Sequence, residues 1–204
     1  MNDQPSLEAT LSEPGSSDIA PSVFYINYFD MISDSKVRGL MALCSEILAK
    51  VNPKTLYFAF SSKGGDVIAG VTLYNFLRGL PVQLIMHNLG SVDSIATAIF
   101  LAADTRYACQ HSRFLFHGIN WNFAQNQSST PTQVREILSG LQQSEDLIRE
   151  LVVQRSKLTE TEMLALLQQG ETKDPAFALQ KGIINEIRDF SLPMGAQIVT
   201  AYFQ

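Results

Sequence analysis

The sequence predicts an α/β fold built around a largely parallel sheet. Segments rich in β-branched and aromatic residues alternate along the chain with segments whose apolar residues recur at helical spacing. Strands that alternate with helices in this way form parallel sheets with right-handed crossovers. The chain has 204 residues, of which 46% are hydrophobic, so it can build the core of one domain of this kind.

Strands and helices are expected to alternate as far as His117. The first helix ends before Pro53, and a turn at Gly64 and Gly65 separates the second strand from the second helix. The expected strands cover residues 23–29, 55–60, 82–86 and 113–116, and the expected helices cover residues 33–50, 67–77 and 94–103.

The second half of the chain is expected to be mainly helical. A polar segment at residues 120–132 leads into a long helix over residues 132–156. Its apolar stripe is interrupted at residues 142–146, and such an arm can project from the core. The later elements expected are a helix over residues 159–168 that starts with a capping box, a helix from Asp174-Pro175 to about Gly182, and a last strand over residues 183–187.

Charge and hydropathy exclude several kinds of partner. The formal net charge is −5 without a compensating Lys/Arg run, so we expect no binding to nucleic acid. No segment approaches the roughly 18 apolar residues of a membrane span, and no signal-peptide pattern is present, so a soluble, cytoplasmic protein is expected.

Residues 1–22 are acidic and rich in Ser and Pro, which predicts a disordered or cleavable leader. Cys44 and Cys109 are expected to be free thiols, with a single bridge as the alternative.

Two segments at the ends of neighbouring strands carry the pattern of an acyl-transfer site. The turn at Gly65 follows one strand and residues 90–95 follow the next, at the edge where parallel sheets bind ligands. A nucleophile at a tight turn into a helix exposes its oxygen, and nearby backbone N–H groups stabilise the oxyanion. Ser94 is the candidate nucleophile, and the N–H groups of Gly65 and Ile95 are the candidate donors. His117, at the end of the following strand, is the candidate base.

Each of these residues also has a structural interpretation. Ser94 or Asp93 can cap the helix, the glycine pair can form a simple turn, and His117 can be a hydrogen-bonded structural histidine. The joint pattern, rather than any single residue, favours catalysis. The two remaining histidines lack a partner group in an obvious position and keep the structural interpretation; they are His87 and His111.

The motifs and their order resemble the Clp protease proteolytic subunit family, ClpP, of the crotonase-like superfamily, over residues 23–187. Residues 62–70 are similar to the family's Ser-Pro-Gly-Gly turn with its following Ala-Gly, and residues 90–95 are similar to its Gly-x-Ala-Ala-Ser-Met motif. Residues 114–117 match the apolar strand that ends in the base histidine. Residues 135–138 fall where the family's projecting handle helix has a similar run.

The resemblance implies a single domain over residues 23–204, with the ClpP/crotonase-like spiral of repeated β-β-α units, a parallel sheet and a handle helix at about residues 120–156. It also implies a serine peptidase site. The roles that it implies are nucleophile for Ser94, base for His117 and oxyanion donors for the N–H groups of Gly65 and Ile95.

The third catalytic residue of the family, an aspartate, has no counterpart in this sequence. Counting back from Gly182 without gaps places Gly170 at its position. Asp174 precedes a proline at a helix start, so its carboxylate is expected to bind backbone N–H groups. Glu171 is one residue out of register and one methylene longer, and it is the candidate substitute acid for His117.

Three further departures bear on activity. Lys63 replaces the proline of the motif, Asp93 precedes the nucleophile in place of alanine, and Gly118-Ile119 replaces the Gln-Pro that commonly follows the histidine. If Asp93 faced the site, its charge would disfavour a negatively charged intermediate, whereas as a helix cap it would be harmless. Loss of the orienting acid leaves the imidazole free to adopt the wrong tautomer, which lowers turnover by about 10⁴ in a comparable triad.

The leading hypothesis is a Clp-type serine endopeptidase subunit that hydrolyses unfolded polypeptides through an acyl-enzyme on Ser94. The resemblance implies self-association into rings, and the apolar surface of the long helix agrees with an interface between rings. It also implies a separate ATP-dependent unfoldase, since no Gly-rich phosphate-binding loop is present. No cofactor and no metal are expected. The alternatives are a catalytically impaired structural or regulatory ring subunit, favoured by Gly170 and Asp93, a crotonase-type acyl-CoA enzyme, and a Ser/Lys dyad that uses Lys63.

Overall fold

An eight-stranded, mostly parallel sheet forms the centre of the structure, a computed structural model that describes residues 22–120 and 128–202. The α/β class with a parallel sheet is therefore confirmed. The predicted leader lies outside the described residues, except for Ser22. The strands are β1 (Val23–Tyr28), β2 (Thr55–Ser62), β3 (Gln83–Asp93), β4 (Thr105–Ala108), β5 (Arg113–Leu115), β6 (Thr172–Lys173), β7 (Glu186–Ile187) and β8 (Gln197–Thr200).

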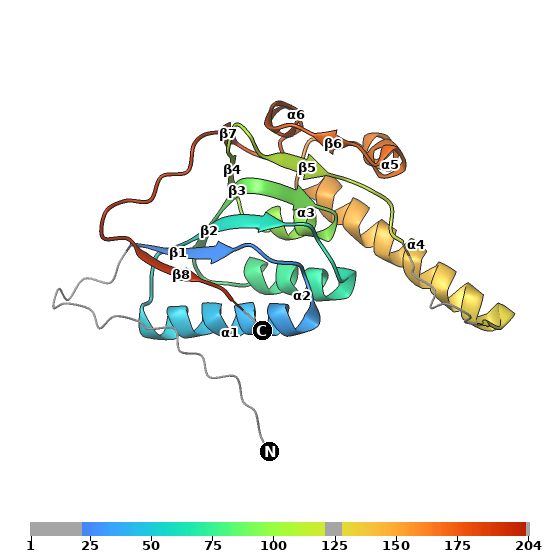
Figure 1. The fold of residues 1–204 in the computed structure, drawn as a ribbon, viewed down its shortest axis with the longest axis horizontal. Coiled ribbons are helices and arrows are strands. Elements are labelled where there is room, and N and C mark those ends of the chain that lie inside the picture. Colours follow the sequence, from blue (N-terminus) through green and yellow to red (C-terminus); the bar gives the residue numbers. More distant parts are fainter. Residues whose placement is uncertain (1–21, 121–127, 203–204) are drawn as a thin grey trace, which may run out of the picture.

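Six helices accompany these strands in the described part of the chain. They are α1 (Asp34–Lys50), α2 (Val67–Arg78), α3 (Ile95–Phe100), α4 (Pro131–Gln154), α5 (Glu160–Gln169) and α6 (Pro175–Gln180). Figure 1 shows α1, α2 and α3 on one side of the strands and α4 running away from the sheet. Along α4, Ile148 and Val152 are buried near the sheet, whereas Val134 and Leu138 are exposed. Within the described residues, no helix is both long and apolar enough to cross a membrane.

Strand β3 connects the body of the sheet to the strands at its edge. The main strand order is β6-β5-β3-β2-β1-β8, and β4 pairs with β3 as a branch. The first half of β3 pairs with β4 from Ile85 to Asn88, and its last three residues pair with β5, where Asp93 lies opposite Leu115. The carboxyl end of β3 therefore lies between the ends of β2 and β5. This is the edge at which the sequence places the candidate site.

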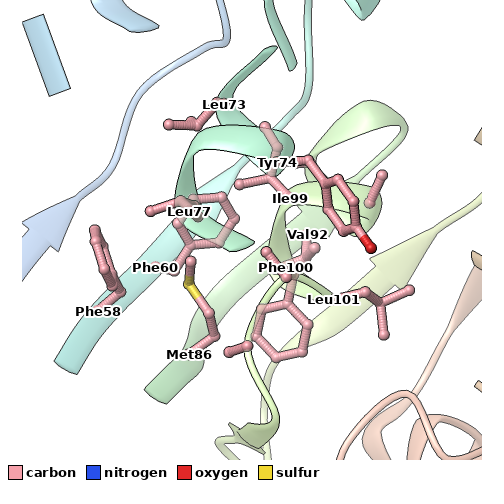
Figure 2. Packing of buried hydrophobic residues seen from close by; sticks show 14 of the residues in the cluster. Phe58, Phe60, Leu73, Tyr74, Leu77, Met86, Val92, Ile99, Phe100 and Leu101 are labelled. Carbon is pink, nitrogen blue, oxygen red and sulfur yellow. The ribbon is translucent and has the colours of Figure 1, made fainter. Parts of the chain in front are cut away.

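The core fills the space between the sheet and helices α1 to α3. Aromatic and aliphatic side chains from β2 and β3 meet those of α2 and α3, as Figure 2 shows for Phe60, Leu77, Met86 and Phe100. All four are at most 1% exposed, and burial of each large apolar side chain stabilises the fold by about 1.5–3 kcal/mol. This packing fixes the start of α3, which begins directly after Ser94.

The helix starts agree with the cap residues expected from the sequence. Thr159 opens α5 with a complete capping box to Glu162, and Asp174 caps α6 before Pro175. The cysteines are free thiols, as expected; Cys44 is buried, and burial raises the pKa of its thiol to about 12.

Strand β3 and helix α3 differ most from their predicted lengths. Strand β3 continues to Asp93 instead of ending at residue 86, because its polar residues are buried and bonded: Asn88 donates to the Arg113 carbonyl at 2.9 Å. Helix α3 ends at Phe100, before the predicted end at residue 103, although the next three residues are also buried.

The sequence analysis missed three short strands, and it placed the last strand wrongly. Strands β4, β6 and β8 have two to four residues, and pairing with β3, β5 and β1 forms them rather than a pattern of their own. The segment expected to form the last strand over residues 183–187 is extended only in β7, and β8 follows it at the sheet edge.

Candidate active site

Ser94 occupies the junction between β3 and α3 in a strained backbone conformation. Its φ and ψ are 58° and −132°, and Asn52 is the other non-glycine residue with positive φ among those described. The Ser94 N–H donates to the Leu115 carbonyl at 2.8 Å, and the Ser94 carbonyl accepts from Thr97 N–H at 2.9 Å. Its hydroxyl makes no capping hydrogen bond to α3. The side chain is thus not used as a helix cap, and the turn presents it at the sheet edge.

The Gly64-Gly65 turn presses against this junction and has no room for side chains. A Cβ atom added at Gly64 would lie 2.7 Å from the Asp93 carbonyl oxygen and 2.9 Å from Ser94 Cβ. A Cβ atom added at Gly65 would lie only 2.1 Å from the Ile32 carbonyl oxygen. Ile32 holds the turn by donating to the Gly64 carbonyl and accepting from Asp66 N–H, both at 2.9 Å.

Two backbone N–H groups beside Ser94 are free to act as donors. Within the described residues, neither Gly65 N–H nor Ile95 N–H has a hydrogen-bond acceptor. The Ile95 N–H is free because it begins α3, and the first N–H groups of a helix have no partner inside the helix. The two segments are close, since a Cβ atom on Gly64 would lie 3.5 Å from Ile95 N.

His117 follows β5 and lies next to the end of β3. Its partly buried ring places Nδ1 2.7 Å from the Gly118 carbonyl oxygen. In the described part of the chain, no hydrogen bond joins the ring to Ser94 Oγ, and such bonds are commonly long before substrate binds. The pairing of Asp93 with Leu115 nevertheless brings the nucleophile and the histidine to the same edge.

Gly170 lies two residues before β6, the strand that pairs with β5 just ahead of His117. Strand β6 is antiparallel to β5, with Leu115 opposite Thr172. The pairing ends there, because Gly170 is the left-handed C-cap of α5, and beyond it the Gly118 N–H donates to the Leu167 carbonyl of α5 at 3.0 Å. A carboxylate at position 170 would therefore lie on the short segment between α5 and β6, close to the segment that carries His117.

Neither of the nearby carboxylates is bonded to His117 in the described residues. Glu171 accepts from Lys173 Nζ at 3.0 Å, and its side chain is 64% exposed. Its assignment as the substitute acid stays a prediction. Asp174 accepts from Phe177 N–H at 2.8 Å, so its carboxylate caps α6, as the sequence analysis expected.

Removal of the Asp174 carboxylate is therefore expected to change stability and not reactivity. Asp174→Ala deletes the cap of α6 and should lower the free energy of unfolding by about 1 kcal/mol. Chemical denaturation measures this change, and the modification rate of Ser94 serves as the control. A large loss of Ser94 reactivity in a folded Asp174→Ala protein would contradict the role of Asp174 as a cap.

Asp93 precedes the nucleophile but does not cap α3. It is buried and accepts from Ser91 Oγ at 2.5 Å, and Ser91 Oγ in turn accepts from Arg113 Nε at 3.0 Å. The carboxylate is therefore part of a network with a cation on the neighbouring strand β5. This network is not evident from the sequence, which suggested Asp93 either as a helix cap or as a group facing the site.

The remaining histidines agree with their structural interpretation. His87 is fully buried, with Nδ1 2.7 Å from the Tyr57 hydroxyl and Nε2 3.0 Å from the Arg188 carbonyl oxygen. Burial lowers the pKa of His87 and keeps its ring neutral. His111 is exposed, as is Lys63 beside the glycine turn.

One residue near the base was missed by the sequence analysis. Glu145 of α4 lies beside the segment after His117, where its Oε1 accepts from Ile119 N–H at 3.4 Å. The signal was the polar interruption of the apolar stripe at residues 142–146. That interruption marks the position where α4 passes this segment.

Comparison with known proteins identifies the family. The family model described as Clp protease matches residues 24–190. The chain therefore belongs to the Clp protease family, as the sequence motifs predicted. It is 28% identical to the ATP-dependent Clp protease proteolytic subunit 2 of Pseudomonas aeruginosa over 166 residues, which cover 78% of this chain and 81% of that protein.

Two further relatives extend this result. The ATP-dependent Clp protease proteolytic subunit of Deinococcus radiodurans is 23% identical over 161 residues, or 78% of this chain and 74% of that protein. The solved structure of a ClpP1 point mutant from Listeria monocytogenes has the same fold, with a TM-score of 0.71 at 16% identity over 83% of this chain and 92% of that chain.

Proposed function

We propose that this chain is an active serine-type endopeptidase subunit that cleaves unfolded polypeptides. His117 removes the proton from Ser94 Oγ, which attacks the peptide carbonyl and forms the acyl-enzyme. The N–H groups of Gly65 and Ile95 stabilise the oxyanion, and His117 gives the proton to the leaving amine. Water then hydrolyses the acyl-enzyme. Glu171 would complete the triad only if its side chain left Lys173.

The observation that carries this proposal is the conformation of Ser94. A non-glycine residue with a φ of 58° is strained, and strain of this kind is retained where surrounding contacts impose it. Here the Gly64-Gly65 turn and the Leu115 carbonyl hold the residue in place. Among the described residues, the result is a serine whose hydroxyl makes no capping hydrogen bond, beside two N–H groups without an acceptor, which is the arrangement that acyl transfer needs.

The proposed assembly is a ring of identical subunits in the cytoplasm that receives substrate from a separate ATP-dependent unfoldase. The curated relatives are named as subunits of ATP-dependent proteases, which supports an ATPase on another chain. On α4, Val134 and Leu138 are 48% and 53% exposed, and this apolar surface fits an interface between subunits or rings.

A second candidate function is a catalytically impaired structural or regulatory ring subunit. It is favoured by Gly170, the residue that the motif count places where the family has its catalytic aspartate. The two candidates differ in one measurable property, the reactivity of Ser94.

A serine-directed fluorophosphonate separates the two candidates. The folded full-length chain is expected to take up one probe per subunit, and Ser94→Ala is expected to abolish this uptake; intact-mass spectrometry measures both. Ser45→Ala, which removes an exposed hydroxyl on α1, is the matched control and should label like the wild type. Absence of modification in folded wild-type protein would contradict the peptidase and favour the impaired subunit.

A further inference from the structure

A single peptide group separates the candidate base from a carboxylate of α4. The Gly118 carbonyl oxygen lies 2.7 Å from His117 Nδ1, and the Ile119 N–H donates to Glu145 Oε1 at 3.4 Å. These two groups are the C=O and N–H of the same planar peptide, and in a trans peptide they point in opposite directions. The imidazole and the carboxylate therefore lie on opposite sides of one rigid unit.

The contact with Gly118 fixes the tautomer of His117. A carbonyl oxygen has no proton to donate, so His117 Nδ1 carries the hydrogen in this bond. In the neutral ring, Nε2 then holds the lone pair. This is the tautomer that the aspartate selects in a Ser-His-Asp triad, and it leaves Nε2 to act as the base.

The preceding peptide, between His117 and Gly118, is also held in place. The Gly118 N–H donates to the Leu167 carbonyl at 3.0 Å. A Cβ atom added at Gly118 would lie 3.0 Å from Glu145 Oε1, so the glycine permits the close approach of the carboxylate. Among the ion pairs of the described residues, Glu145 has none, and its charge is not neutralised by a side chain there.

A carboxylate that accepts from one end of a peptide strengthens the acceptor at the other end. The negative charge polarises the amide and increases the partial charge on its carbonyl oxygen, because hydrogen bonds in a chain reinforce each other. The Gly118 carbonyl thereby becomes a better acceptor for His117 Nδ1 than an isolated peptide carbonyl. The polarised Gly118 carbonyl therefore supplies part of the effect that an acid at position 170 would have on His117 Nδ1.

We propose that Glu145 is the positioning residue for His117, acting through the Gly118-Ile119 peptide in place of the missing triad acid. The catalytic significance of this relay rests on the proposed peptidase function, whereas its effect on the tautomer does not. The sequence around the histidine fits it, because Gly118-Ile119 replaces a dipeptide whose proline would lack the N–H that Glu145 accepts.

The tautomer of His117 provides the direct test, and it requires no turnover. In protein with ¹⁵N-labelled histidine, the ring nitrogens of His117 are expected to show Nδ1 protonated and Nε2 unprotonated at about pH 8, above the ordinary pKa of histidine. In Glu145→Gln the two shifts should move toward each other, because a neutral amide polarises the peptide less. In the matched control Glu150→Gln, which removes an exposed carboxylate of α4 bonded to Gln154, they should stay at the wild-type values.

The modification rate of Ser94 gives the second readout. Glu145→Gln should slow fluorophosphonate labelling by about twofold, because the carboxylate acts on His117 only by strengthening the hydrogen bond at the other end of the peptide, and Glu150→Gln should not change it. Wild-type ring shifts in Glu145→Gln would overturn the proposal, even if Ser94 labels normally. If the shifts change as expected but wild-type Ser94 does not label, the relay stands and the peptidase function is contradicted.

Discussion

Gly170→Asp is expected to raise the rate of Ser94 modification by about 10²-fold to 10³-fold. The substitution restores a carboxylate at the position that the motif count assigns to the family's aspartate, two residues before β6. The full loss of an orienting aspartate costs about 10⁴, and the Gly118 carbonyl already supplies part of its effect, so the gain is smaller than that factor. Labelling kinetics and hydrolysis of a fluorogenic peptide measure the change.

The backbone at position 170 accepts this substitution. Gly170 ends α5 with a φ of 61° and a ψ of 31°, the left-handed conformation that aspartate tolerates better than most residues. A Cβ atom added there meets no other atom within 4 Å. The expected cost in stability is about 1 kcal/mol.

Gly195→Asp is the matched control for this prediction. Gly195 also has positive φ and open space around its Cβ position, but it lies in the segment before β8. It adds the same charge without approaching His117. Equal rates in the two variants would show that position 170 does not face the base. In the Gly170→Asp background, Glu145→Gln should have little further effect, because a direct carboxylate replaces the relay.

Gly65→Ala is expected to lower Ser94 reactivity by about 10²-fold to 10³-fold and to destabilise the fold. The added methyl group would lie 2.1 Å from the Ile32 carbonyl oxygen, so the turn must move away from Ile32. This movement displaces the Gly65 N–H, and removal of one oxyanion donor costs a factor of this size. The φ of 150° adds strain for a residue with a side chain, and together these effects should cost a few kcal/mol.

Thermal unfolding and labelling kinetics, measured on the same sample, separate the two effects of Gly65→Ala. Gly140→Ala is the control, since Gly140 lies in α4 with no atom near its Cβ position. Alanine there should leave reactivity unchanged and stabilise the helix by up to about 1 kcal/mol. Wild-type reactivity in Gly65→Ala would exclude the Gly65 N–H from the oxyanion hole.

The sequence predicted those parts of the fold whose pattern is local. The apolar periodicity of α1 and α2 and the β-branched character of β1 and β2 predicted these elements to within a few residues. Polar residues in the second half of β3 concealed its length, because the partners that satisfy Asn88 come from a strand 25 residues further on. The two-residue strands have no periodicity to detect, and only pairing with their neighbours reveals them.

The candidate site likewise contains residues that the sequence predicted and one, Glu145, that it did not. Ser94, Gly65 and Ile95 belong to turns that a sequence motif predicts, and the placing of the missing acid at Gly170, by counting from the next motif, stays a prediction. The contact of Glu145 with Ile119 spans 26 residues and depends on the direction in which α4 leaves the sheet. No local pattern specifies that direction.

Ser94 and His117 follow strands of very different length, β3 and β5. Ser94 directly follows the eleven-residue strand β3, which is paired on both sides. His117 follows the three-residue strand β5, whose neighbour at the sheet edge, β6, has only two residues. Short elements open locally at lower free energy than long, buried ones. Misalignment of the pair would therefore begin with the histidine, and a ligand or neighbouring subunit that secured the β5–β6 edge would raise activity without contacting the serine.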